Sequence, residues 1–353
     1  MMIIKKTISL LLAAVLLLSC LVSCTPTEKS NVQSRTVSYV YFNTVTVISE
    51  YAGADPEVFE GYINEADNLL GYYHKLFDIY YEYSGVNNIK TINDNAGVSP
   101  VKVDKELVDF LIYCKELFTL TNFKTNIMMG SVLKIWHDIR EDNENISAED
   151  TPLLPENTSL IEANLHTSID SLVINENECT VYISDPKASI DVGAIGKGYA
   201  VEKLYEHLKA LGANHMALNV GGNIRTIGLN VGEKMWVTGI TNPDKSSDEP
   251  YACRVQIGET ALVTSGDYER YFIADGVKYH HIIDPETLMP ARYFTSISIF
   301  TSNSALADAL STALFCMSYE EGLALVNKIG NIEVIWIDTD YNVKMTPGVK
   351  IAE

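Results

Sequence analysis

Residues 189–200 read SIDVGAIGKGYA, with three glycines and a lysine placed directly before an apolar, helix-like run. A phosphate-binding P-loop has the pattern GxxxxGK followed by Ser or Thr, and the final hydroxyl binds magnesium. Here Gly193 and Lys197 stand too close together for that pattern, and Gly198 occupies the position of the hydroxyl residue. The dinucleotide-binding pattern GxGxxG is absent as well. The stretch is therefore neither of the two common nucleotide-binding loops.

The same stretch still has features that favour an anion. Its glycines allow a ligand to come close to the backbone, and residues 200–211 have the pattern of a helix that Gly212 ends. Lys197 then lies near the start of this helix, where a positive charge is unfavourable for the helix dipole. Asp191 or a ligand phosphate would balance that charge. Taken alone, however, so short a motif more often marks a glycine-rich turn with a solvated lysine.

The composition is that of a globular protein. Of the 353 residues, 47% are hydrophobic and 20% are charged, which suits a chain with a large core. The formal net charge of −20 argues against a nucleic-acid partner, because binding to a phosphate backbone requires clustered Lys and Arg. The same charge is compatible with a bound divalent cation.

The N-terminus has the pattern of an export signal. Lys5 and Lys6 precede an apolar run over residues 7–18, which is too short to span a membrane comfortably. The tetrapeptide LVSC then ends at Cys24 and resembles the bacterial lipobox, in which the cysteine is lipidated and becomes the first mature residue. LLSC, which ends at Cys20, is a poorer candidate, and an ordinary signal peptide or a membrane anchor is the alternative.

We therefore predict three segments along the chain. They are a lipoprotein signal peptide over 1–23, the lipidated Cys24 with a flexible tether over 24–36, and a folded domain over 37–353. The mature protein is expected at the cell membrane on its extracytoplasmic face, which is the periplasmic side if the cell has two membranes.

Four cysteines remain in the mature domain, and none of them forms a CxxC pair: Cys114, Cys179, Cys253 and Cys316. We interpret them as small, buried apolar residues rather than as a zinc site or a disulfide framework.

The hydrophobic pattern changes between helix and strand along the chain, which predicts an α+β fold. No internal repeat is present, and no membrane span is predicted after the signal. Predicted helices cover 57–77, 105–120, 200–211 and 304–317, and predicted strands lie within 37–51, 171–184, 215–220, 236–241, 253–264 and 295–301. Residues 80–100 are predicted as a long loop and residues 141–156 as an acidic surface excursion.

Three further stretches carry groups that suit a ligand. NVGGN at 219–223 follows a short apolar run, and paired glycines there suit a tight bend or a ligand close to the backbone. Ser265 and Gly266 offer a hydroxyl and backbone amides. His281 and Asp284 stand three residues apart before a proline, so a turn can bring them together as an acid–base pair. A structural histidine bonded to a turn carboxylate fits the same spacing equally well.

The predicted helix over 304–317 contains Asp308 and Thr312, which are four residues apart and therefore lie on one face. A carboxylate and a hydroxyl are hard oxygen ligands that suit Mg²⁺ together with waters and a substrate phosphate. The alternative is that Asp308 only interacts with the helix dipole and Thr312 bonds its own helix. An acid among Ala and Leu nevertheless needs a partner.

Taken in this order, the segments resemble the ApbE family, the FAD:protein FMN transferases. The resemblance runs from about residue 39 to the end of the chain, and five motifs in order are far more specific than any one of them. They are DVGAIGKGYA (191–200), NVGGNI (219–224), TSGDYERYF (264–272), HIIDPET (281–287) and DALSTA (308–313). The resemblance implies a single large α+β domain of two lobes that is related to the T-fold.

The resemblance also implies a reaction. FAD is split at its pyrophosphate, FMN is joined to a Ser or Thr hydroxyl of a target protein as a phosphoester, and AMP is released. Mg²⁺ is the required cofactor, and extracytoplasmic redox proteins of the electron-transport type are the usual acceptors. A lipid-anchored enzyme outside the cytoplasm suits such partners.

The family's site residues fall on matching positions of this sequence. The metal site falls on the Ala194 carbonyl, the Asp308 carboxylate and the Thr312 hydroxyl. His281 matches the family histidine near the scissile phosphates, and either His281 or a nearby carboxylate such as Asp284 is expected to accept the proton of the incoming hydroxyl. Contacts to the flavin nucleotide are expected at Tyr80, Asn122, Phe123, Lys124, Asp191, Lys197, Ser265 and Ile282.

Three places depart from the family's pattern. Leu288 stands where the family usually has Gly, Phe42-Asn43-Thr44 replaces a Met-Gly-Thr near the flavin, and Lys124 replaces a common Asp. These departures concern the rim of the substrate pocket more than the metal site.

Two other functions remain open from the sequence. One is a Mg²⁺-dependent FAD pyrophosphatase that releases free FMN and AMP, and the other is a non-catalytic, FAD-binding lipoprotein. The intact set of Ala194, Asp308 and Thr312 favours an enzyme, because a protein that only binds FAD needs no metal over the pyrophosphate.

Overall fold

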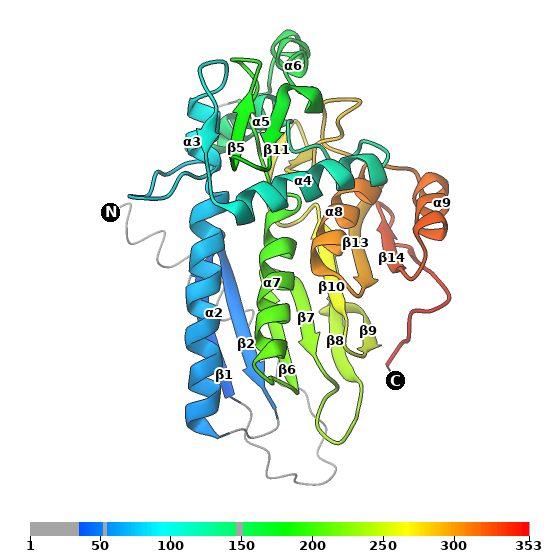
Figure 1. Ribbon diagram of the computed structural model, residues 1–353. Coiled ribbons are helices and arrows are strands. Elements are labelled where there is room, and N and C mark those ends of the chain that lie inside the picture. Colours follow the sequence, from blue (N-terminus) through cyan, green and yellow to red (C-terminus); the bar gives the residue numbers. More distant parts are fainter. Residues whose placement is uncertain (1–34, 52–54, 146–150, 353) are drawn as a thin grey trace.

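An eight-stranded antiparallel sheet forms the frame of the protein, and long helices lie along one of its faces (Figure 1). The computed structural model describes residues 35–51, 55–145 and 151–352. The predicted signal peptide, Cys24 and most of the predicted tether lie outside these residues. Across the sheet the strands are β1 (Arg35–Tyr41), β2 (Thr44–Glu50), β6 (Met216–Val220), β7 (Asn223–Ile227), β10 (Ala261–Gly266), β13 (Phe294–Thr301), β14 (Glu333–Asp338) and β15 (Val343–Met345).

Both faces of the sheet are covered, because side chains alternate between the two faces along each strand. In β10, Ala261 and Val263 pack into the core under the helices, whereas Leu262 packs with Trp236 on the opposite face. The helices are α2 (Pro56–Phe77), α7 (Gly196–Ala210), α8 (Ser304–Phe315) and α9 (Tyr319–Ile329). The opposite face is covered by the hairpin of β8 (Trp236–Thr241) and β9 (Tyr251–Ile257). In the described part of the chain, no helix is both long and apolar enough to cross a membrane.

A second lobe lies at one end of the sheet, in the upper part of Figure 1. It contains α3 (Ile89–Asp94), β3 (Val101–Lys102), α4 (Lys105–Leu120), α5 (Gly130–Asn145), α6 (Asn157–Asn164), β4 (Leu172–Asn175), β5 (Thr180–Ile183), β11 (Tyr271–Ala274) and β12 (Val277–His280). The chain passes between the lobes several times, so they share one core. The prediction of a single α+β domain is confirmed.

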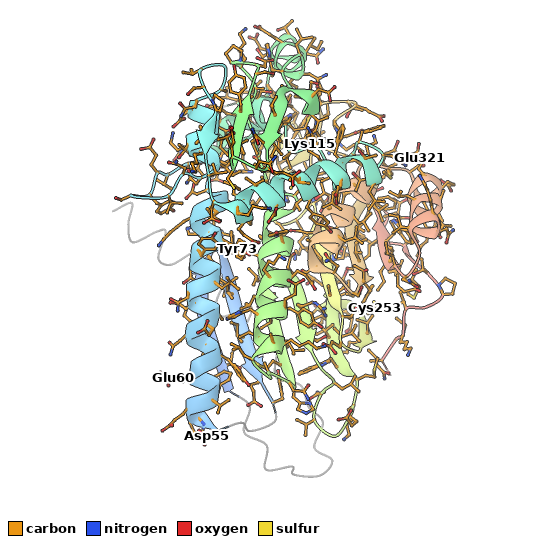
Figure 2. All side chains as sticks on the ribbon, in the orientation of Figure 1. Asp55, Glu60, Tyr73, Lys115, Cys253 and Glu321 are labelled. Carbon is orange, nitrogen blue, oxygen red and sulfur yellow. The ribbon has the colours of Figure 1, made fainter. Side chains whose placement is uncertain are left out.

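A half-buried carboxylate ties the two lobes together. Glu106 of α4 accepts hydrogen bonds from the hydroxyl of Tyr73 on α2 at 2.8 Å and from that of Tyr199 on α7 at 3.0 Å. Figure 2 shows Tyr73 at the end of α2 that faces α4. Burial raises the pKa of both tyrosines far above the ordinary value, so both hydroxyls remain donors. Three helices therefore meet at one acceptor.

Three predicted strands are shorter than expected. Residues 37–51 form the hairpin β1–β2, because Phe42 and Asn43 adopt positive φ angles of 52° and 55° that reverse the chain. Residues 171–184 likewise form the hairpin β4–β5, with Cys179 at φ 50°. Residues 253–264 divide between β9 and β10. The strands themselves were predicted, but the turns within them were not.

The helices also differ from the predictions. The predicted loop over 80–100 contains α3, which begins with a capping box between Asn88 and Thr91. The predicted surface excursion over 141–156 begins inside α5, which ends at Asn145. Helix α7 begins at Gly196, four residues before the predicted start, so Lys197 belongs to its first turn.

The prediction for the cysteines is partly wrong. Cys114 and Cys316 are buried, but Cys179 and Cys253 are partly exposed. All four are free thiols, and none is in a disulfide.

Helices α7 and α8 come into direct contact at Gly198. A Cβ atom at this position would lie 2.4 Å from the Ser304 carbonyl oxygen and 2.5 Å from the Asp308 Cβ. Real atoms do not approach this closely, so only glycine allows the two helices to meet here.

We expect Gly198→Ala to lower the free energy of unfolding by about 1–3 kcal/mol, because the added methyl group forces α7 and α8 apart. The matched control is Gly61→Ala within α2, where an added Cβ has no neighbour within 4 Å. That change should stabilise the protein by up to about 1 kcal/mol through helix propensity. Urea denaturation of the three proteins measures both effects, and equal stabilities would contradict the packing argument.

Candidate functional site

The start of α7 meets the middle of α8 through a hydrogen bond. The amide of Gly198 donates to Oδ2 of Asp308 at 2.8 Å. This amide is one of the donors at a helix start that have no partner within their own helix, and a carboxylate is favourable there. The carbonyl of Ala194, just before the helix, accepts no backbone hydrogen bond from the described residues. The start of α7 therefore contacts Asp308 of α8 through the Gly198 amide, and the Ala194 carbonyl lies just before this helix start.

Asp308 is buried, with 4% of its surface exposed. Burial raises the pKa of its carboxyl group, while Lys197, the Gly198 amide and Asn223 act in the opposite direction. The side-chain amide of Asn223 in β7 lies beside the carboxylate, yet both of its polar atoms are buried without a hydrogen bond of ordinary geometry. Buried polar atoms without partners are rare, and here they indicate a site that a ligand completes.

These groups fit a hard cation. Thr312 lies one helical turn after Asp308 on the same face of α8, and it is half-buried. Those residues also contain no cluster of three His, Cys, Asp or Glu side chains that could hold a metal. One carboxylate with neutral oxygens suits Mg²⁺, which retains waters and takes further oxygens from a phosphate. The metal ligands Ala194, Asp308 and Thr312 remain a prediction.

His281 lies directly after β12 and is surrounded by positive charge. Its Nδ1 atom is buried without a hydrogen-bond partner. Burial, together with Arg270, His280, Lys197 and Arg140, lowers the pKa of the ring to about 3. The ring is therefore neutral near pH 7 and can accept a proton. Cations grouped around a neutral ring favour an anion in the space between them.

Tyr80 and Asp191 belong to the same group of side chains. The hydroxyl of Tyr80 lies 3.0 Å from Nδ1 of His137, and Arg140 lies 3.4 Å from the same ring. Burial raises the pKa of Asp191, whereas the Gly193 amide, His137 and Arg270 lower it. Electrostatic interactions thus connect the predicted residues Tyr80, Asp191, Lys197, His281 and Asp308.

Three members of this group were not predicted: His137, Arg140 and Arg270. His137 and Arg140 are three residues apart on α5, a helix that the sequence analysis did not identify. Arg270 stands inside the quoted motif TSGDYERYF but was not singled out. The i, i+3 spacing of His137 and Arg140 would have been the signal for these two, once residues 130–145 were identified as a helix.

The predicted pairing of His281 with Asp284 is wrong. Asp284 is buried and forms an ion pair of 3.0 Å with Lys124, which also contacts Glu286 at 2.9 Å. A buried carboxylate needs a partner, and the lysine satisfies it while His281 remains unpaired. The departure of Lys124 from the family's pattern therefore has a local function, because it holds the loop after His281.

The other predicted flavin contacts lie around this centre. Asn122 and Phe123 have positive φ angles in the turn after α4, and Phe123 is 59% exposed. The hydroxyl of Ser265 lies 2.7 Å from that of Ser311 on α8. Ile282 is buried in the core under α8, with its amide bonded to His280 and its carbonyl to Ala291. Its contact with the flavin remains a prediction.

The backbone conformation of Leu288 shows why the family usually has glycine at this position. It has a φ angle of 60°, in the left-handed region that favours glycine. Its side chain is buried, and its carbonyl accepts a hydrogen bond of 2.9 Å from Trp136. Packing with Trp136 thus offsets the backbone strain of about 1 kcal/mol.

Comparisons with known proteins agree on one family. A model of the ApbE family matches residues 42–336. The FAD:protein FMN transferase of Treponema pallidum is 31% identical over 275 residues, which cover 74% of this chain and 73% of that protein. That of Haemophilus influenzae is 24% identical and covers 95% of this chain and 94% of its own. The ApbE protein from Thermotoga maritima superposes with a TM-score of 0.76 at 25% identity, over 89% of this chain and 97% of that one. The flavin transferase ApbE from Vibrio cholerae, at 24% identity and a TM-score of 0.73 over 89% of this chain and 97% of that one, shares the fold.

The position of His281 predicts a dependence of stability on pH. The unfolded chain takes up this proton near pH 6.5, whereas the folded protein takes it up only near pH 3. The free energy of unfolding therefore falls as the pH is lowered between these values. We expect His281→Asn to make that fall shallower.

Urea denaturation between pH 7 and pH 4, without FAD or metal, measures the slope. His207→Gln, which changes an exposed histidine of α7, is the control and should follow the wild-type curve. An unchanged slope in His281→Asn would show that the ring is protonated in the folded protein.

Proposed function

This chain belongs to the ApbE family and is a flavin transferase, and we propose that it moves FMN from FAD onto a Ser or Thr hydroxyl of an acceptor protein, releasing AMP. The observation that supports the proposed site best is the buried Asp308, which accepts a hydrogen bond from the start of α7 and interacts electrostatically with Lys197. A carboxylate so placed suits a metal that holds a pyrophosphate.

We assign a different role in phosphoryl transfer to each residue of the site. The Ala194 carbonyl, Asp308 and Thr312 would hold Mg²⁺, which when bound supplies positive charge to the pyrophosphate oxygens. Lys197 interacts electrostatically with both Asp308 and His281, so its ammonium group is placed to bind a phosphate between them. The main contribution of the protein is to position the two reactants in line.

The acceptor hydroxyl must lose a proton in this reaction, and we propose His281 as the group that takes it up. Nδ1 of His281 is buried and unpaired, so it is our candidate to take up this proton while the hydroxyl oxygen bonds to the phosphorus of FMN. The negative charge of a bound pyrophosphate would raise the pKa of the ring from its low value and make it a better base. The bond between the two phosphates of FAD breaks in the same step, and AMP leaves with the electron pair of that bond. The nearby cations compensate the negative charge that develops.

We also propose that the enzyme is a lipoprotein. The lipobox-like LVSC at Cys24 supports a palmitate-bearing anchor in the cell membrane, with the domain on the extracytoplasmic side. Flavoproteins of extracytoplasmic electron transport are then the expected acceptors.

The transfer can be tested with FAD, Mg²⁺ and an acceptor subunit of an extracytoplasmic electron-transport complex, prepared without the FMN that it normally carries. We expect Asp308→Asn to lower the rate of FMN transfer at least about 100-fold, because the amide still accepts from Gly198 but has lost the charge that binds the metal. Flavin fluorescence on the acceptor in a denaturing gel measures transfer, and AMP is measured in parallel.

The control is Asp109→Asn, which changes an exposed carboxylate of α4 and should leave the rate unchanged. AMP without a labelled acceptor would identify a FAD pyrophosphatase, and neither product would identify a protein that only binds FAD. Full activity in Asp308→Asn would contradict the metal assignment.

The anchor has its own test in the full-length chain. We expect Cys24→Ser to remove the protein from the membrane fraction and to abolish incorporation of labelled palmitate, because the acylated thiol is lost. Cys20→Ser is the matched control and should remain in the membrane fraction. Loss of labelling in Cys20→Ser alone would move the anchor to that residue.

A further inference from the structure

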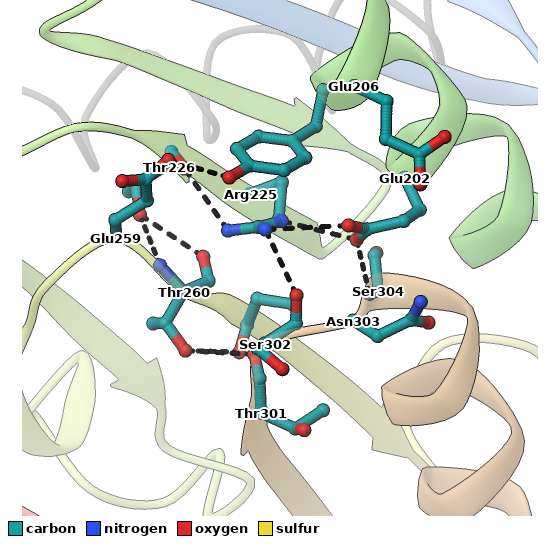
Figure 3. A network of polar contacts seen from close by, with 12 residues as sticks. Glu202, Glu206, Arg225, Thr226, Glu259, Thr260, Thr301, Ser302, Asn303 and Ser304 are labelled. Atoms are coloured by element: carbon teal, nitrogen blue, oxygen red, sulfur yellow. Dashed lines mark hydrogen bonds and ion pairs between the residues drawn. The ribbon is translucent and has the colours of Figure 1, made fainter. Parts of the chain in front are cut away.

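A second layer of contacts joins the same three elements that meet at Asp308. In the first layer, Gly198 of α7, Asp308 of α8 and Asn223 of β7 lie together. In the second layer, Oε2 of Glu202 on α7 accepts a hydrogen bond of 2.6 Å from the amide of Ser304, the first residue of α8 (Figure 3). The same oxygen is 3.2 Å from Nε of Arg225 on β7.

The spacing of the two layers matches along all three elements. Gly198 and Glu202 are four residues apart on α7, as are Ser304 and Asp308 on α8, which corresponds to about 6.0 Å along a helix. Asn223 and Arg225 are two residues apart on β7, or about 6.6 Å along a strand. The two layers are therefore in register, one helical turn from each other.

The direction of the hydrogen bonds reverses between the layers. In the first layer α8 supplies the carboxylate and α7 the amide, and in the second layer α7 supplies the carboxylate and α8 the amide. Two such bonds, one turn apart, fix both the rotation of α8 and its position along α7. With only one of these hydrogen bonds, α8 could still rotate about its axis or slide along α7.

Arg225 holds the chain just before α8. Its guanidinium group donates to the carbonyl of Ser302 at 3.0 Å and to that of Thr226 at 3.3 Å, and it lies 3.4 Å above the ring of Tyr205. Only 3% of Arg225 and 7% of Glu202 are exposed. The ion pair thus fixes residues 302–304 at two points: Arg225 bonds the Ser302 carbonyl and Glu202 bonds the Ser304 amide.

We infer that Glu202 and Arg225 are positioning residues for the metal site at Asp308. Ser304 and Asp308 belong to one helical turn, so a fixed Ser304 amide places the Asp308 carboxylate at the start of α7. A buried ion pair is a poor source of stability compared with apolar side chains, which fits a role in alignment. This inference rests on the proposed function, because it assumes that Asp308 binds a metal.

The test is the affinity of the full-length protein for Mn²⁺, measured from the EPR signal of the free ion with and without FAD. Glu202→Gln keeps an oxygen that accepts from Ser304 but removes the charge that holds Arg225. We expect it to weaken Mn²⁺ binding by about 10-fold or more, as changes behind metal ligands do. At saturating Mg²⁺, FMN transfer should return to within a few fold of wild type.

Two further variants make the test specific. Arg225→Lys keeps the charge but loses the forked geometry, and it should weaken Mn²⁺ binding in the same way. The control, Glu206→Gln, lies one turn further along α7, where its carboxylate is 54% exposed and pairs with Lys203. It should bind Mn²⁺ as the wild type does.

The outcomes separate this inference from the proposed function. Wild-type Mn²⁺ affinity in both Glu202→Gln and Arg225→Lys, even with a lowered melting temperature, would overturn the inference, because the pair would then only stabilise the fold. A wild-type protein that binds no Mn²⁺ in either condition would overturn the proposed metal site itself, and the inference with it. Circular dichroism confirms that each variant is folded at the temperature of the measurement.

Discussion

The contact between the Gly198 amide and the Asp308 carboxylate is the constraint on which the rest of the structure depends. It requires two helices to approach more closely than any side chain at residue 198 would permit. The strands beneath α7 and α8 must accordingly hold both helices in register, and β7 does so through side chains that reach each of them. The sheet, the glycine and the buried acid are parts of one arrangement around a helix start.

Much of this fold is readable from local pattern, and the exceptions have physical causes. The helix around Asp308 and Thr312 could be predicted, because its apolar face is continuous and its cap is regular. The sequence predicts one strand where the β1–β2 hairpin lies, because Phe42 and Asn43 are not the Asn-Gly pair that usually marks such a turn. Its register is set by pairing across the sheet, which no local window contains.

The ion pairs and cations of the site are harder to predict from the sequence than its candidate metal ligands. Asp284 was expected to pair with His281, three residues away, but Lys124 competes for it from 160 residues away. Arg140 approaches His281 from α5 and Arg270 from the bend before β11, so the sequence around His281 indicates neither partner. Sequence motifs locate groups that share a turn or a helix face, whereas partners brought together by tertiary folding appear only in the structure.

The hydrogen bond from Gly198 to Asp308 also bears on whether the protein folds before or after it binds a cation. One oxygen of the acid is satisfied by the backbone alone, so the chain can fold before it meets a cation, unlike small domains whose folding waits for zinc. A chelator would then abolish the transfer activity while the protein remains folded. Folding and metal binding can then be separate steps, with the cation taken up by a domain that is already folded.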